Sequence, residues 1–138
     1  MTSSAPSVLF VCVKNGGKSQ MAAGLMRQEA GVGVEVSSAG TRAGSDLNQL
    51  SVDVLREVGV DISAERPQQL TDDMVAAADV VVVVGTDAQV EPVEGTRVLV
   101  WDVDEPSRRG VEGVERMRLV RDDIAERVGA LAAELRAP

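Results

Sequence analysis

The chain of 138 residues contains no histidine and a single cysteine, Cys12. These absences exclude the common zinc sites and the catalytic pairs in which a histidine activates serine or cysteine. A lone cysteine also cannot form an intramolecular disulfide. The net charge of −8 argues against binding to a nucleic-acid backbone or an anionic membrane surface. We therefore expect no metal, no nucleic-acid partner and no membrane partner.

Aromatic residues and lysines are also scarce. Phe10 and Trp101 are the only aromatic residues, and the chain has no tyrosine. The 14 basic residues include only two lysines, Lys14 and Lys18, and both lie within six residues of Cys12. Valine is abundant by contrast, with 25 residues. The length suits one domain with a hydrophobic core of its own.

No segment of the sequence resembles a targeting signal. Residues 1–6 are small and polar or contain proline, which predicts a flexible N-terminal tail before a single domain over 7–138. The first apolar run, 8–13, is too short for a signal or membrane helix, and no basic segment precedes it. We expect a cytoplasmic protein, and the lone thiol fits that reducing compartment.

The spacing of apolar residues predicts alternating strands and helices. The strands are expected to be apolar on both faces, which indicates a parallel sheet covered by helices on both sides. Right-handed crossovers then favour a single-domain, doubly wound α/β fold with a four-stranded parallel sheet and flavodoxin-like topology. The predicted strands are 7–13, 32–38, 79–84 and 97–101, and the predicted helices are 19–30, 47–58, 72–77 and 111–135.

The segment after the first strand carries the main chemical signal. Ligands of such folds bind at the carboxyl ends of the strands, where Cys12 lies. Gly16 and Gly17 allow the backbone to curl around an anion, and Asn15 tolerates a left-handed backbone. The amides of this turn and the N-terminus of the following helix would hold a tetrahedral oxyanion. The same field would favour the reactive thiolate form of Cys12.

Simpler interpretations of this segment remain open. A cysteine that ends a valine-rich strand is often buried and inert, and a glycine pair after a strand is often only a turn. The nucleotide-binding loop GxxxxGK[ST] is a second phosphate motif. It fits poorly, because Val13 stands where its first glycine belongs.

The spacing Cys12-x5-Lys18-Ser19 resembles the C-x5-R-S loop of the low-molecular-weight protein tyrosine phosphatase superfamily. Further landmarks follow in the family's order: Ser38-Ala39-Gly40-Thr41, the turn 58–63, the stretch 70–80, and an acidic pair before Pro106. The resemblance covers roughly residues 7 to 135. It implies the low-molecular-weight phosphatase-like fold and a nucleophilic Cys12.

Departures from the phosphatase pattern indicate a particular branch of this superfamily. Lys18 replaces the arginine of phosphatases, and only Trp101 could form an aromatic wall for an aryl phosphate. Arsenate reductases of this fold often use further cysteines to form an internal disulfide that thioredoxin reduces. This chain cannot form that disulfide, because Cys12 is its only cysteine. The stretch 13–24 resembles the arsenate-mycothiol transferases, single-cysteine enzymes of the arsenate reductase branch.

The resemblance implies a transferase mechanism for arsenic detoxification. Cys12 would attack arsenate, Lys18 would hold the oxyanion, and Ser19 would hydrogen-bond the thiolate. Mycothiol would accept the arseno group as co-substrate, and a glutaredoxin-like mycoredoxin would complete reduction to arsenite. No tightly bound cofactor is expected, and phosphate or sulfate would mimic arsenate. The implied substrate-binding residues are Val13, Lys14, Asn15, Gly16 and Gly17.

The general acid is expected in the acidic pair before Pro106. Glu105 matches the family by position, and Asp104 matches it by residue type. The pair can also be read as a solvated turn. Asp122 and Asp123 are interpreted as the solvated face of the last helix.

Three other functions remain open. They are a low-molecular-weight protein tyrosine phosphatase, a non-catalytic oxyanion-binding module, and an α/β domain with an unrelated small-molecule site. The acceptor thiol is open as well, between mycothiol, bacillithiol and glutathione.

Overall fold

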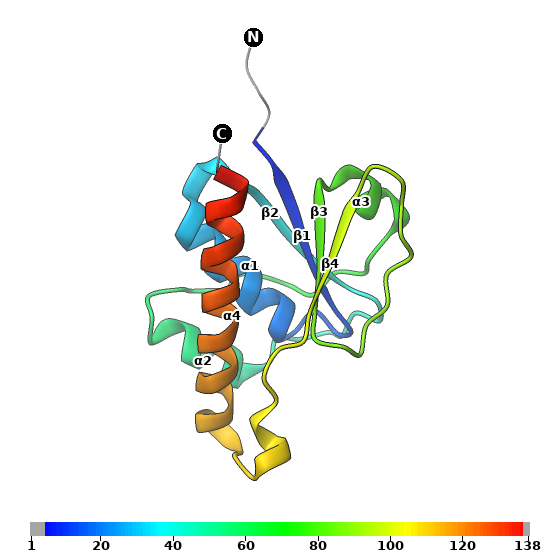
Figure 1. Cartoon of the computed structure of the whole chain (residues 1–138). Helices are drawn as coiled ribbons and strands as arrows, with labels where there is room; N and C mark the ends of the chain where they lie inside the picture. The colour runs from blue at the N-terminus through cyan, green and yellow to red at the C-terminus, as the bar shows by residue number, and fades with distance from the viewer. Residues whose placement is uncertain (1–4, 137–138) are drawn as a thin grey trace.

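The computed structural model describes residues 5–136 and contains one four-stranded parallel sheet. The spatial order of the strands is β2-β1-β3-β4, which confirms the predicted doubly wound sheet (Figure 1). β1 and β3 lie in the centre, so the valine-rich runs are covered on both faces. The strands are β1 (Ser7–Cys12), β2 (Glu35–Gly40), β3 (Val80–Val84) and β4 (Arg97–Trp101).

Helices cover both faces of the sheet. Figure 1 shows α1, α2 and α4 on one side and α3 on the other. Alternate residues of β1 point to the two layers: Phe10 packs in the larger core with α1, α2 and α4, whereas Val11 packs in the smaller core beside α3. The helices are α1 (Lys18–Ala30), α2 (Gln49–Arg56), α3 (Asp72–Ala77) and α4 (Gly113–Arg136), with short 3₁₀ turns at Gly31–Gly33 and Pro106–Arg109.

Several predicted boundaries were wrong by a few residues. The second strand begins at Glu35, because Gly31–Gly33 forms a 3₁₀ turn, and it continues to Gly40. α2 begins at Gln49, since the Asn48 side chain accepts a hydrogen bond from the Ser51 amide at 2.9 Å and caps the helix. The first strand ends at Cys12, which leaves Val13 in the loop. Thr71 caps α3, since its side-chain oxygen accepts a hydrogen bond from the Met74 amide at 3.2 Å.

The predicted N-terminal tail is partly attached to the sheet. The Pro6 carbonyl accepts a hydrogen bond from the Glu35 amide at 2.8 Å. Residues 1–4 of the predicted tail, and 137–138 of the predicted domain, lie outside the described residues. Over the part that is described, no helix combines the length and apolar character needed to cross a bilayer.

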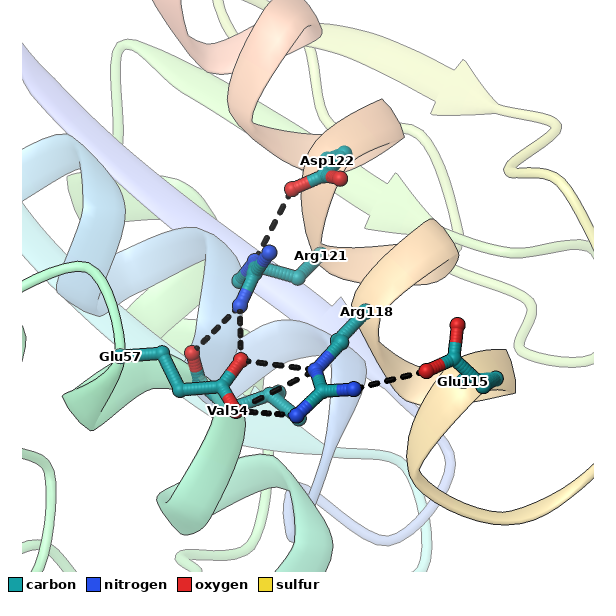
Figure 2. Close-up of polar contacts among 6 residues, drawn as sticks. All are labelled: Val54, Glu57, Glu115, Arg118, Arg121 and Asp122. Atoms are coloured by element: carbon teal, nitrogen blue, oxygen red, sulfur yellow. Dashed lines mark hydrogen bonds and ion pairs between the residues drawn. The ribbon is translucent and has the colours of Figure 1, made fainter.

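A group of charged residues fastens α4 to the end of α2 (Figure 2). Arg118 and Arg121 both bind the Glu57 carboxylate, with closest contacts of 2.7 Å. Arg121 is buried and also donates to the Val54 carbonyl at 2.8 Å, which satisfies a carbonyl near the end of α2. These contacts set the position of the first half of α4, which reaches the site described next.

Candidate active site

The loop between β1 and α1 is held open by a second loop, residues 41–48. The amides of Thr41, Arg42, Gly44 and Asn48 donate to the carbonyls of residues 12, 13, 14 and 16 at 2.7–3.0 Å. With those carbonyls turned outward, the amides of residues 14, 16 and 17 have no hydrogen-bond acceptor within residues 5–136. The predicted oxyanion loop is therefore lined by free N–H donors.

Asn15 fixes the shape of this loop from the protein interior. It is buried and has a φ of 56°, the left-handed conformation expected from the sequence. Its side-chain oxygen accepts from the Gln68 amide at 3.0 Å and from Gln20 Nε2 at 3.2 Å. Asn15 therefore supports the loop from the protein side, and its side chain is engaged there.

The Cys12 thiol lies at the base of the loop. Cys12 Sγ is 2.9 Å from Ser19 Oγ and accepts from the Asn15 amide at 3.3 Å. Ser19 Oγ accepts from Asn15 Nδ2 at 2.7 Å, so its own proton is free to point at the sulfur. The N-terminus of α1, with no acidic residue in its first turn, adds positive potential. The Ser19 hydroxyl, the Asn15 amide and the start of α1 thus all face the Cys12 sulfur.

A cavity of about 260 Å³ opens above the thiol, and we call it the Cys12 cleft. Lys18 borders it and lies against Gly85, where an added Cβ would be 3.6 Å from Lys18 Nζ. Asp87 also borders the cleft and was not among the predicted site residues. The rule that ligands bind at strand ends, applied to the end of β3, would have pointed to Gly85 and Asp87. The lining residues are Cys12, Val13, Lys14, Lys18, Val84, Gly85, Asp87 and Ala88.

The two acids before Pro106 are both paired with arginines. Glu105 accepts two hydrogen bonds from Arg116, at 2.7 and 2.8 Å, and these lower the pKa of its carboxyl to about 2. It also lies 3.9 Å from Lys18 Nζ. Asp104 accepts two bonds from Arg109, which lower the pKa of that carboxyl as well.

The general-acid prediction for Glu105, with Asp104 as the alternative, gains no support from this arrangement. A proton donor must hold its proton near the working pH, whereas the arginine partners lower the pKa of both carboxyls. The structure brings Glu105 to Lys18 but gives Asp104 no contact with the loop. The acid role stays a prediction that substitution can test.

Trp101 does not form the aromatic wall considered from the sequence. Only 8% of Trp101 is exposed, and its ring packs against Phe10 with centroids 5.7 Å apart. Since these are the only two aromatic residues of the chain, no aromatic side chain borders the Cys12 cleft.

A second and larger cavity, of about 540 Å³, lies on the other side of the loop, and we call it the Arg42 cleft. Lys14 and Lys18 border both cavities. The lining residues are Lys14, Gly16, Gly17, Lys18, Arg42, Gly44, Ser45, Asp46, Leu47, Asn48, Ser51, Arg116, Met117 and Val120.

A thiol with a serine donor beneath a ring of free amides, at the end of a central parallel strand, defines a class of cysteine enzymes that act on tetrahedral oxyanions. This chain belongs to the low molecular weight phosphotyrosine protein phosphatase family, whose model matches residues 7–138. The family resemblance seen in the sequence is thereby confirmed.

Several of the individual proteins to which this chain is similar are arsenate reductases. The arsenate reductase of Bacillus subtilis is 34% identical over 133 residues, which cover 91% of this chain and 94% of that protein. A thioredoxin-dependent arsenate reductase of Corynebacterium glutamicum superposes with a TM-score of 0.82 at 33% identity, over 98% of this chain and 64% of that one. This chain thus spans less than two thirds of that protein. An arsenate reductase in a phosphate-binding state superposes with a TM-score of 0.82 at 27% identity. The match covers 94% of this chain and 98% of that one.

Proposed function

We propose that this protein is an arsenate reductase that works as a thiol transferase, with Cys12 as its only nucleophile. The observation that carries the proposal is the Cys12–Ser19–Asn15 cluster beneath the free loop amides, in a chain with one cysteine. Relatives named arsenate reductases support the arsenate substrate. The lack of a second cysteine supports an external thiol as the next reactant.

In the first step the Cys12 thiolate attacks the arsenic of arsenate held by the loop amides and Lys18. A sulfur–arsenic bond forms and an arsenic–oxygen bond breaks. Because the arginine pairs lower the pKa of both Glu105 and Asp104, we assign the proton that the departing oxygen needs to the second hydroxyl of the arsenate monoanion itself. Thiolate plus H₂AsO₄⁻ then yields the Cys12–AsO₃²⁻ adduct and water, and arsenic stays pentavalent.

In the second step an external thiolate attacks the arsenic and Cys12 leaves as a thiolate. We propose mycothiol as the acceptor, in the cytoplasm, on the strength of the sequence resemblance. A mycoredoxin thiolate then attacks the mycothiol sulfur. The sulfur–sulfur bond forms, the arsenic–sulfur electron pair moves to arsenic, and arsenite leaves.

Replacement of Cys12 tests the nucleophile. Cys12→Ser should abolish arsenate consumption with mycothiol and mycoredoxin, and retained turnover would refute the scheme. Supplying thioredoxin as the only reductant tests the transferase route separately. Efficient turnover with thioredoxin alone would mean that no acceptor thiol is needed.

The alternative function is hydrolysis of phosphotyrosine, the reaction after which the matched family is named. Lys18 cannot make the two-pronged contact of an arginine with two oxyanion oxygens, and no aromatic side chain borders the Cys12 cleft. We therefore expect little hydrolysis of an aryl phosphate. Hydrolysis comparable to arsenate turnover under the same conditions would favour the phosphatase instead.

A further inference from the structure

Beyond the loop residues 14–18, the lining of the Arg42 cleft takes no part in the arsenate step proposed above, although this cavity is the larger of the two beside the loop. It adjoins the Cys12 cleft at Lys14 and Lys18, which border both. A reactant that occupied it would therefore lie next to Lys14 and Lys18, which also border the cavity at the Cys12 thiol. Its volume of about 540 Å³ falls in the range of small-molecule sites.

The walls of the Arg42 cleft are fixed rather than loose. The Gly44 and Asn48 amides bind the loop carbonyls of residues 14 and 16, at 2.9 and 2.7 Å. Gly16 has no room for a side chain, since an added Cβ would lie 2.8 Å from the Asp46 carbonyl. On the α4 side, Glu105 holds Arg116 through two hydrogen bonds.

The lining combines cations, neutral hydrogen-bonding groups and an apolar wall. Met117 and Val120 are buried and supply apolar surface from α4. Ser45 supplies a hydroxyl group and Asn48 a side-chain amide nitrogen, since the Asn48 oxygen already accepts from Ser51, and Asp46 is the one acid of the lining. Lys14 and Arg42 have no ion pair and no side-chain hydrogen bond within residues 5–136. On a chain of net charge −8, this is a local concentration of cations and donors that suits an oxygen-rich ligand.

We infer that the Arg42 cleft binds the non-reacting part of the acceptor thiol, and that Arg42 helps to select it. The ligand class is a low-molecular-weight thiol whose body carries many oxygen atoms. This inference rests on the proposed function. The acceptor sulfur would reach arsenic where the clefts adjoin, form a sulfur–arsenic bond and release Cys12 as a thiolate, with no change in the oxidation state of arsenic.

The test is Arg42→Ala, because Arg42 borders this cleft and not the Cys12 cleft. With arsenate saturating, KM for mycothiol or for the preferred oxygen-rich thiol should rise about five- to tenfold, with kcat nearly unchanged. KM for 2-mercaptoethanol, which lacks such a body, should not change. The rate of Cys12 adduct formation without thiol should also stay within about twofold.

The matched control is Arg108→Ala, an exposed arginine of the 3₁₀ turn that borders neither cleft. It should leave KM for every thiol unchanged. Arg42→Glu separates the two kinds of oxygen-rich thiol. For carboxylate thiols such as glutathione it should raise KM beyond the alanine value, whereas for the uncharged polyol of mycothiol the two variants should match.

The inference fails if Arg42→Ala raises KM equally for 2-mercaptoethanol and the oxygen-rich thiols, or for none of them, while adduct formation stays normal. The proposed function would survive that result. Absence of arsenate turnover by the unaltered protein with any thiol is a different outcome, because it would refute the proposed function itself.

Discussion

At the residue scale, Asn15 determines how the thiol is presented. Its backbone amide donates to Cys12 Sγ, and its side-chain amide occupies an acceptor site of Ser19 Oγ. Its own carboxamide oxygen is held by Gln68 and Gln20. The donors that face the sulfur are thus oriented before any substrate arrives, which lowers the reorganisation needed during attack.

Ser19→Ala should slow the reaction of Cys12 with iodoacetamide at pH 7 about ten- to hundredfold. The variant removes a hydrogen bond to a charged acceptor and leaves the Asn15 side-chain amide without its partner. The measurement is the alkylation rate followed by mass spectrometry. Ser37→Ala, at a half-buried position of β2, is the control and should react like the unaltered protein. An unchanged rate in Ser19→Ala would mean that Ser19 does not activate the thiol.

Glu105 offers a second prediction at this scale. With the pKa of its carboxyl near 2, Glu105 is ionised across the neutral range, beside Lys18 and Arg116. Glu105→Gln removes a negative charge close to the oxyanion loop, so phosphate should inhibit about two- to fivefold more strongly. The value of kcat should stay within about threefold. A fall in kcat of a hundredfold or more, with loss of activity at high pH, would instead assign the general acid to Glu105.

At the scale of elements, the end of β2 determines whether the oxyanion loop can close. β2 ends at Gly40, where an added Cβ would lie 2.6 Å from the Val13 carbonyl and 3.0 Å from the Asn15 amide. The motif Ser38-Ala39-Gly40-Thr41 therefore has a structural reason at its glycine. A side chain there would push against the backbone of the loop.

Gly40→Ala should destabilise the protein by about 1–3 kcal/mol and reduce arsenate turnover, because the overlap is with backbone that cannot rotate away. Urea unfolding and turnover of the same sample provide the two measurements. The control is Gly33→Ala, where an added Cβ meets nothing within 4 Å. Equal stability of the two variants would show that the loop accommodates the methyl group.

The contact between α2 and α4 gives a prediction on pH. Hydrogen bonds from Arg118 and Arg121 lower the pKa of Glu57 to about 2. A lowered pKa in the folded state means that the ionised carboxylate stabilises the fold above its ordinary pKa of 4.5 and loses this effect as pH falls toward 2. Glu57→Gln should therefore lower Tm at pH 7 and flatten the loss of stability between pH 5 and 2.

The measurement is thermal unfolding of both proteins at several pH values across that range. Glu126→Gln is the matched control, an exposed glutamate of α4 with no ion pair among the residues described. It should keep the slope of the unaltered protein. A parallel slope in Glu57→Gln would show that the arginines do not hold Glu57 in the folded state.

At the scale of the whole molecule, periodicity predicted the architecture, and contacts between loops decided the site. The unbroken valines at 80–84 predicted a buried parallel strand, because no polar face interrupts them. The glycine pair Gly16-Gly17, between a buried strand and a helix, predicted the oxyanion loop. Other contacts depend on how distant segments pack, and no local sequence pattern predicts them. Examples are the hydrogen bond from the Asn48 amide to the Gly16 carbonyl and the ion pair of Glu105 with Arg116. The sequence alone therefore could not predict that Arg116 lowers the pKa of Glu105.

The two cores should unfold together, because β1 and β3 contribute side chains to both. Phe10 and Val82 belong to the larger core, while Val11 and Val81 belong to the smaller one. Loss of either layer therefore exposes apolar residues of the central strands. Trp101, buried in the larger core, reports on that layer by fluorescence, whereas far-UV circular dichroism reports on all helices and strands. The two urea transitions should coincide, and a dichroism change at lower urea than the fluorescence change would show that the layer with α3 unfolds independently.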